Sequence, residues 1–154
     1  MKETERISKL FEDLYDGHPW IDVTILPNLK KLTAKQAVKR IYSDWNTIWE
    51  IVNHIISWRE TVLLRIQGKN IKSPSHNYFI DVEDTSAAAW KNTLERLEFS
   101  QQLWLVFLKN FNESDFDTIY RANKITYYEH IHGILQHDAY HLGQIVIMSK
   151  RVRK

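Results

Sequence analysis

The sequence predicts an all-α protein, a four-helix bundle that forms a single domain over residues 1–154. Three observations predict this class. The chain has only four Gly and three Pro, which leaves room for long helices and few tight turns. Apolar residues recur at intervals of three and four along several segments. Hydrophobic residues make up 44% of the chain and charged residues 26%, a balance typical of a globular domain with a sizeable core.

The first two helices are expected in the N-terminal half. One runs over about Glu3–Asp16, where the apolar residues form one stripe, and Gly17 ends it because glycine readily takes the left-handed conformation. The next is expected over about Thr33–Gln67. Its start is predicted by Thr33–Gln36, which has the form of a capping box, and its apolar residues recur at threes and fours.

The third helix is expected to begin near Asp84–Ser86 and to end near Asn110, with apolar residues at heptad spacing that suits bundle packing. Further apolar residues extend its surface to other sides: Leu103, Leu105, Val106 and Phe107. This surface predicts either a central position in the bundle or a homodimer interface. The fourth helix is expected to begin at a second capping box, Thr126–Glu129, and to end near Ser149.

Connections of about fifteen residues are expected between these helices. At about 3.3 Å per residue, such a connection outreaches a helix of about 20 residues, which is about 30 Å long. Neighbouring helices therefore need not alternate in direction, and long crossover connections are open to the chain. Strand-like segments are expected within them at Val23–Leu26 and Tyr78–Val82, and loops of this length often line a functional site.

Composition excludes several classes of protein. Without cysteine the chain has no disulfide, no thiolate metal ligand and no cysteine nucleophile. Its charged N-terminal segment lacks the apolar core of a signal peptide, and its longest apolar run, Leu103–Leu108, is too short to span a bilayer. We therefore expect a cytoplasmic protein with no membrane partner. A net charge of +2 gives no general reason to expect a nucleic-acid partner. The tail Lys150–Lys154 is basic, but positive charges at a helix C-terminus also interact favourably with the helix dipole.

Two histidines stand four residues apart in the fourth helical segment, His137 and His141. This spacing places both imidazoles on one helix face, where they can bind one divalent metal ion. Ile134 and Met148 lie on either side of the two histidines on the same heptad-spaced line, so the histidines are expected to face the bundle interior. The motif resembles the H-E-x-x-H of zinc proteases, but Asp138 stands where the glutamate that acts as general base would be. No His, Asp or Glu follows His141 to serve as a third ligand, which those families usually take from downstream. A protease is not expected.

The third ligand must then lie upstream, and His54 is the best candidate because it borders the apolar stripe of the second helix. The alternative for each histidine is a hydrogen-bonded core residue, but burying three unpaired imidazoles is costly. Asp138 points away from the face of His137 and is expected to form a salt bridge or a cap.

Three further residues are candidates for the pocket wall or for contacts that support the ligands: His130, Gln144 and Trp58. For each, a structural role is an open alternative: a partly exposed first-turn residue, a helix–helix hydrogen bond and core packing. His132 falls off the ligand line and is expected at the surface. Tyr140 is expected in packing or in a dimer contact. No residue is identified as the general base.

The segments IWEIVNHIISWRETVLLRIQGK and GILQHDAYHLGQI resemble the DinB/YfiT-like metal-binding superfamily. HPW followed by LTAKQA, and SAAAW, resemble the same family, so the similarity covers nearly the whole chain. The resemblance implies a four-helix bundle with up-down-down-up connectivity and frequent homodimers. It also implies a divalent metal, zinc or nickel above all with iron or manganese also compatible, on three histidines that map onto His54, His137 and His141.

A site of three histidines leaves a coordination position open, which is the pattern of catalytic metals. Some members of the family are thiol S-transferases that use mycothiol or bacillithiol. The resemblance thus implies a metal-dependent enzyme, a low-molecular-weight-thiol (bacillithiol-type) S-transferase acting on small electrophiles. The lack of cysteine agrees with a thiol that arrives as cosubstrate. The alternatives are a metal-dependent hydrolase of small amides or esters and a non-catalytic stress-response metal-binding protein.

Overall fold

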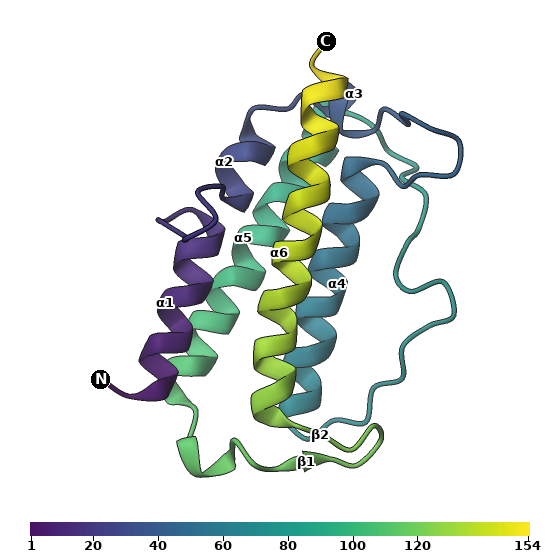
Figure 1. Cartoon of the computed structure of the whole chain (residues 1–154). Coiled ribbons are helices and arrows are strands. Elements are labelled where there is room, and N and C mark those ends of the chain that lie inside the picture. Colours follow the sequence, from purple (N-terminus) through teal and green to yellow (C-terminus); the bar gives the residue numbers. More distant parts are fainter.

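The computed structural model describes residues 1–154, and 62% of them are helical, which confirms the prediction of a mostly helical protein. Four long helices lie side by side (Figure 1): α1 (Glu3–Tyr15), α4 (Ile48–Ile66), α5 (Ala87–Asn110) and α6 (Tyr127–Val152). Shorter elements lie in the connections between them: α2 (Ile25–Lys30), α3 (Ala34–Ala37), the 3₁₀ helix η1 (Glu113–Asp115), β1 (Ile119–Tyr120) and β2 (Ile125–Thr126).

The colours of Figure 1 give the direction of each long helix. α1 and α6 run upward in this view, whereas α4 and α5 run downward. The connection over residues 67–86 returns along the side of the molecule, so that α5 starts at the same end as α4. The antiparallel pair β1–β2 joins the end of α5 to the start of α6.

Two of the predicted helix starts are confirmed by their caps. Ser86 precedes α5, and its side chain accepts a hydrogen bond from the backbone N–H of Ala89. Thr126 precedes α6 and forms the predicted capping box with Glu129. These contacts satisfy backbone N–H groups that have no partner within the helix.

The predicted start of the second helix is wrong. The capping box at Thr33–Gln36 is present, but it caps only the four residues of α3. Residues 38–47 then leave the helix, and a further capping box, Thr47–Glu50, starts α4. Ser43, Asp44 and Asn46 favour turns over helix interiors because their side chains compete for backbone hydrogen bonds, which gives a physical reason for the interruption.

The predicted strand-like segments are also wrong. Val23–Leu26 runs into α2, and Tyr78–Val82 has no regular structure. Asn77 and Tyr78 have positive φ angles of 50° and 60°, which strand geometry does not allow. The first connection, residues 16–47, is about twice as long as expected.

The core lies between the long helices. Trp104 of α5 is fully buried, stacks on Phe11 of α1 with ring centroids 4.9 Å apart, and donates its indole N–H to the carbonyl of Arg59 on α4. Trp49 of α4 packs edge-on against Trp90 of α5 at 5.0 Å. These contacts fix α4 against its neighbours, and α4 in turn packs along α6.

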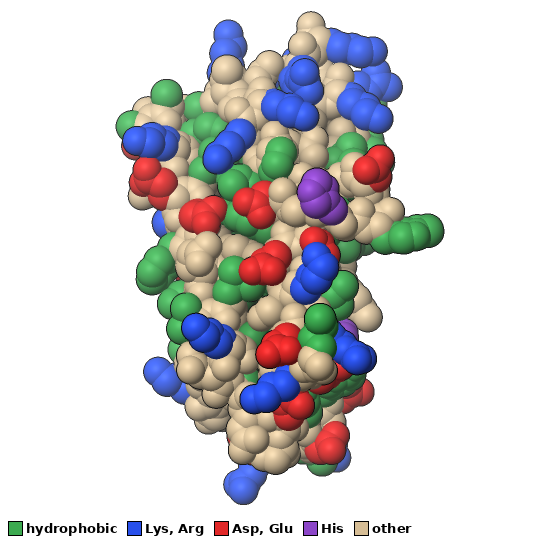
Figure 2. Space-filling view, turned by 90° about the vertical axis from the view of Figure 1, so that its left-hand side faces the viewer, with side chains coloured by type: hydrophobic (Ala, Val, Ile, Leu, Met, Phe, Trp, Pro, Cys, Tyr) green, Lys and Arg blue, Asp and Glu red, His purple; other side chains and the backbone are tan.

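On the face shown in Figure 2, Lys and Arg gather at the upper end of the molecule, while acidic and basic side chains alternate below. None of the helices combines the length and the hydropathy that crossing a membrane requires.

Candidate metal centre

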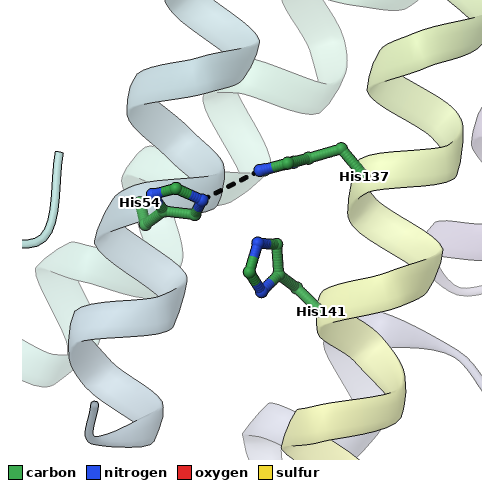
Figure 3. Close-up of side chains that lie close together, drawn as sticks. All are labelled: His54, His137 and His141. Atoms are coloured by element: carbon green, nitrogen blue, oxygen red, sulfur yellow. Dashed lines mark hydrogen bonds between the residues drawn. The ribbon is translucent and has the colours of Figure 1, made fainter. Parts of the chain in front are cut away.

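Three histidines from two helices meet at one point (Figure 3). His54 comes from α4, and His137 and His141 come from consecutive turns of α6. The Nε2 atoms of His54 and His137 are 2.9 Å apart, and one ring nitrogen from each of the three residues lies within 4.8 Å of the other two. The structure therefore brings together the three residues that the sequence proposed as metal ligands.

The Nδ1 atom of each ring faces an oxygen acceptor. His54 Nδ1 donates to the backbone carbonyl of Asn77 at 2.6 Å, and His141 Nδ1 donates to Gln144 Oε1 at 2.7 Å. His137 Nδ1 lies 3.3 Å from Asp138 Oδ1. Because these oxygens accept hydrogen bonds, the ring protons belong on Nδ1, and the Nε2 lone pairs are left free. This is the form in which imidazole binds a metal through Nε2.

Burial disfavours the charged form of two of these rings. His54 is only 2% exposed, and burial lowers its pKa to about 4, although the carbonyl of Asn77 opposes the shift. Burial also lowers the pKa of His141. Two neutral rings whose lone pairs face each other at 2.9 Å repel, whereas a cation between them satisfies both. The donor set therefore fits a divalent metal ion.

The loop over residues 67–86 completes the support of His54. Asn77 and Tyr78 adopt left-handed backbone conformations, and the carbonyl of Asn77 meets the imidazole. Phe79 stacks on the ring of His54 with centroids 4.0 Å apart and planes 8° apart. The side chain of Asn77 accepts a hydrogen bond from Trp58 Nε1 at 3.0 Å. Asn77 and Phe79 were not found from the sequence, because no periodic pattern marks an irregular loop.

A buried ion pair lies next to the Nδ1 atom of His137. Arg59 Nε donates to Asp138 Oδ2 at 2.7 Å, and neither side chain has any exposed surface. The salt bridge expected for Asp138 is confirmed. The second oxygen of this carboxylate, however, is the one that lies near His137 Nδ1, which the helical geometry alone did not suggest.

A cavity of about 630 Å³ lies beside the three histidines. Residues of α4, of α6 and of the two loops next to them line it: Asp44, Trp45, Asn46, Ile51, His54, Trp58, Asn77, Phe79, His137, Tyr140, His141, Gln144, Ile147 and Met148. Trp58 and Gln144 thus lie where the sequence proposed them. Tyr140, expected in packing or in a dimer contact, is 65% exposed at this cavity.

His130 and His132 lie away from the cavity. His130 is buried beside the β1–β2 hairpin, with its Nδ1 3.0 Å from the carbonyl of Thr126 and its ring against Tyr120. It neither lines the pocket nor contacts a ligand, and its 6% exposure also differs from the exposed first-turn alternative. His132 was expected at the surface but is half-buried against Tyr128.

Comparison with known proteins agrees with this arrangement. Residues 24–145, a range that includes all three histidines, match the model of the DinB superfamily. No curated protein and no solved structure matches the chain. The matched range covers most of the sequence and carries both helices of the site, in agreement with the resemblance drawn from the sequence. The chain therefore belongs to the DinB superfamily.

Proposed function

We propose that the protein is a metal-dependent enzyme in which His54, His137 and His141 hold one divalent cation. The observation that carries this proposal is the convergence of three imidazoles, each with Nδ1 facing an oxygen acceptor, in the wall of a cavity of about 630 Å³. A site of three protein ligands beside open space suits a catalytic metal better than a structural one, which is usually closed by four ligands. Zinc and nickel are the first candidates, and iron or manganese also fit histidine ligands.

The reaction that we propose is transfer of a low-molecular-weight thiol of the bacillithiol type to a small electrophile. When bound, the cation would favour the thiolate form of such a thiol at neutral pH. The sulfur then forms a bond to an electrophilic carbon, the leaving group departs with the electron pair of the broken bond, and the thiol proton passes to solvent. The aromatic side chains of Phe79 and Trp58 line the cavity and would limit the access of water to this part of it.

The chain itself supports this choice in two ways. It has no cysteine, which agrees with a reaction in which the thiol arrives as a cosubstrate. The carboxylate beside His137 is not free to take a proton from an attacking water, as a hydrolase with a carboxylate base would require. Asp138 is fully buried and paired with Arg59.

Two further proposals concern the architecture. The directions of the four long helices support the up-down-down-up bundle that the family resemblance implies. A homodimer through α5 is supported by apolar side chains that remain exposed on this helix: Phe99, Leu103 and Val106. Burial of such a patch is a common basis of association.

The test combines the metal-loaded protein with the model electrophile 1-chloro-2,4-dinitrobenzene and, in turn, bacillithiol, coenzyme A or glutathione. We expect metal-dependent loss of free thiol and a thioether product in mass spectrometry, both absent with His137→Ala. If no thiol is consumed while p-nitrophenyl acetate is cleaved in a metal-dependent manner, the protein is a hydrolase. If metal is bound and neither reaction occurs with these or related substrates, the non-catalytic alternative gains support.

A further inference from the structure

Asp138, which forms an ion pair with Arg59, is the only charged group that contacts the Nδ1 atom of one of the three histidines. His54 is held by the neutral carbonyl of Asn77, and His141 by the neutral amide of Gln144. His137 instead faces the carboxylate of Asp138. The three histidines are therefore not equivalent.

Arg59 is held in place from several helices. Its Nη1 donates to Gln101 Oε1 of α5 at 2.9 Å. Its guanidinium carbon lies 5.9 Å from the ring centroid of Phe11 and 5.8 Å from that of Tyr15, both on α1. The guanidinium is thus fixed by α1, α4 and α5 together, and it fixes the carboxylate of Asp138 on α6.

The carboxylate is divided between its two partners. Oδ2 accepts from Arg59 Nε at 2.7 Å, while Oδ1 lies 3.3 Å from His137 Nδ1. A carboxylate at this position holds the proton on Nδ1, directs the Nε2 lone pair toward His54, and makes the imidazole a stronger donor. The salt bridge keeps the carboxylate from turning away.

We propose that Arg59 and Asp138 form a positioning pair that sets the ring orientation of His137 and strengthens its binding of the cation. The pair touches no substrate and acts only through His137. The inference rests on that part of the proposed function in which the three histidines bind a divalent cation, and it does not depend on thiol transfer.

Zinc affinity of the purified protein tests the pair. Asp138→Asn keeps the shape of the side chain and removes its charge, so we expect zinc binding to weaken by about tenfold to a hundredfold, the usual effect of losing such a partner. Asp138→Glu, which keeps the charge on a longer side chain, should recover part of the affinity. The matched control is Glu113→Gln, which makes the same carboxylate-to-amide change in a side chain that accepts hydrogen bonds from Thr4, away from the histidines. Its zinc affinity should stay within about twofold of the wild type.

Two readouts separate positioning from mere support of the fold. The visible spectrum of bound Co²⁺ should change in Asp138→Asn and not in Glu113→Gln, because the spectrum depends on the orientation and donor strength of the imidazoles around the ion. In the metal-free wild type, long-range ¹H–¹⁵N NMR should show the proton of His137 on Nδ1. This measurement needs no variant, so it stands even if Asp138→Asn does not fold.

Three results have distinct meanings. A proton on His137 Nε2 in the metal-free protein would overturn the proposal, as would zinc affinity and a Co²⁺ spectrum unchanged in Asp138→Asn. Wild-type protein that takes up no zinc would instead refute the proposed metal site. Tight zinc binding that depends on Asp138, without any thiol transfer, would leave the positioning pair intact and remove only the proposed reaction.

Discussion

His54 and His137 approach each other from two helices until their Nε2 atoms are 2.9 Å apart, while the Nδ1 atom of each ring faces an oxygen acceptor. Two lone pairs that face each other in a buried space repel, so packing of the core alone does not explain this arrangement. It is the arrangement that a shared cation requires. The packing of α4 along α6 thus brings together a group of residues that could hold a metal ion.

The first prediction concerns the stoichiometry of bound metal. His54→Ala, His137→Ala and His141→Ala should each lose most of the metal, because two remaining imidazoles bind a divalent ion far more weakly than three. Elemental analysis of the purified variants measures this. His18→Ala, at an exposed position of the connection over residues 16–47, is the matched control and should keep its metal. Stoichiometric metal in His54→Ala would remove this residue from the site.

The second prediction compares two threonine caps. Thr47 Oγ1 accepts from the backbone N–H of Glu50 at the start of α4, the helix that carries His54. Thr47→Ala should lower the free energy of unfolding by about 1 kcal/mol, as is usual for loss of an N-cap side chain. Thr33→Ala removes the same kind of contact from the four-residue helix α3 and should cost clearly less. Urea denaturation measures both, and equal losses would show that the short helix matters as much as α4.

The sequence predicted the convergence of the three histidines because each of them lies on a periodic helix. His137 and His141 lie on one face because of their spacing, and His54 lies on the border of an apolar stripe, so each position follows from helix geometry. The same reasoning placed Trp58 and Gln144 at the cavity.

The parts that the sequence did not predict depend on loop conformation and on tertiary contacts. Asn77 supplies its backbone carbonyl, which no side-chain pattern can indicate, and Phe79 reaches His54 from an irregular loop. His130 lies on the same face of α6 as His137 and His141, but at that point this face has passed the cavity and reached the β1–β2 hairpin. Helical periodicity predicts the helix face on which a residue lies, but it does not predict how far along the helix that face lines a site.

The third prediction concerns the backbone of Asn77, whose φ of 50° is rarely adopted by β-branched residues. Asn77→Val should move the carbonyl away from His54 Nδ1 and should lower both stability and metal affinity. Asn77→Gly, which adopts this φ without strain, keeps the carbonyl in place and loses only the hydrogen bond from Trp58. Zinc affinity should therefore fall severalfold more in Asn77→Val than in Asn77→Gly. Equal affinities in the two variants would mean that the backbone contact does not support the site.

The fourth prediction is that the metal-free protein loses stability as the pH falls below neutral. In the unfolded chain His54 and His141 take up protons near pH 6.5, whereas burial lowers the pKa of His54 to about 4 in the folded protein and also lowers that of His141. Between these values the unfolded chain binds more protons than the folded one. The free energy of unfolding is therefore greatest above pH 6.5 and decreases as the pH falls toward about 4.

Urea denaturation in the presence of EDTA, at intervals from pH 7.5 to 4.5, measures this decrease. Carboxylates also contribute to acid destabilisation, so the wild type is compared with His54→Gln at each pH, and the difference between the two isolates the imidazole. The variant should lose less stability between pH 6.5 and 4.5 than the wild type, because glutamine takes up no proton in either state. Parallel pH curves for the two proteins would contradict the argument, since a buried imidazole that stays neutral in the folded state must give the wild type the steeper slope.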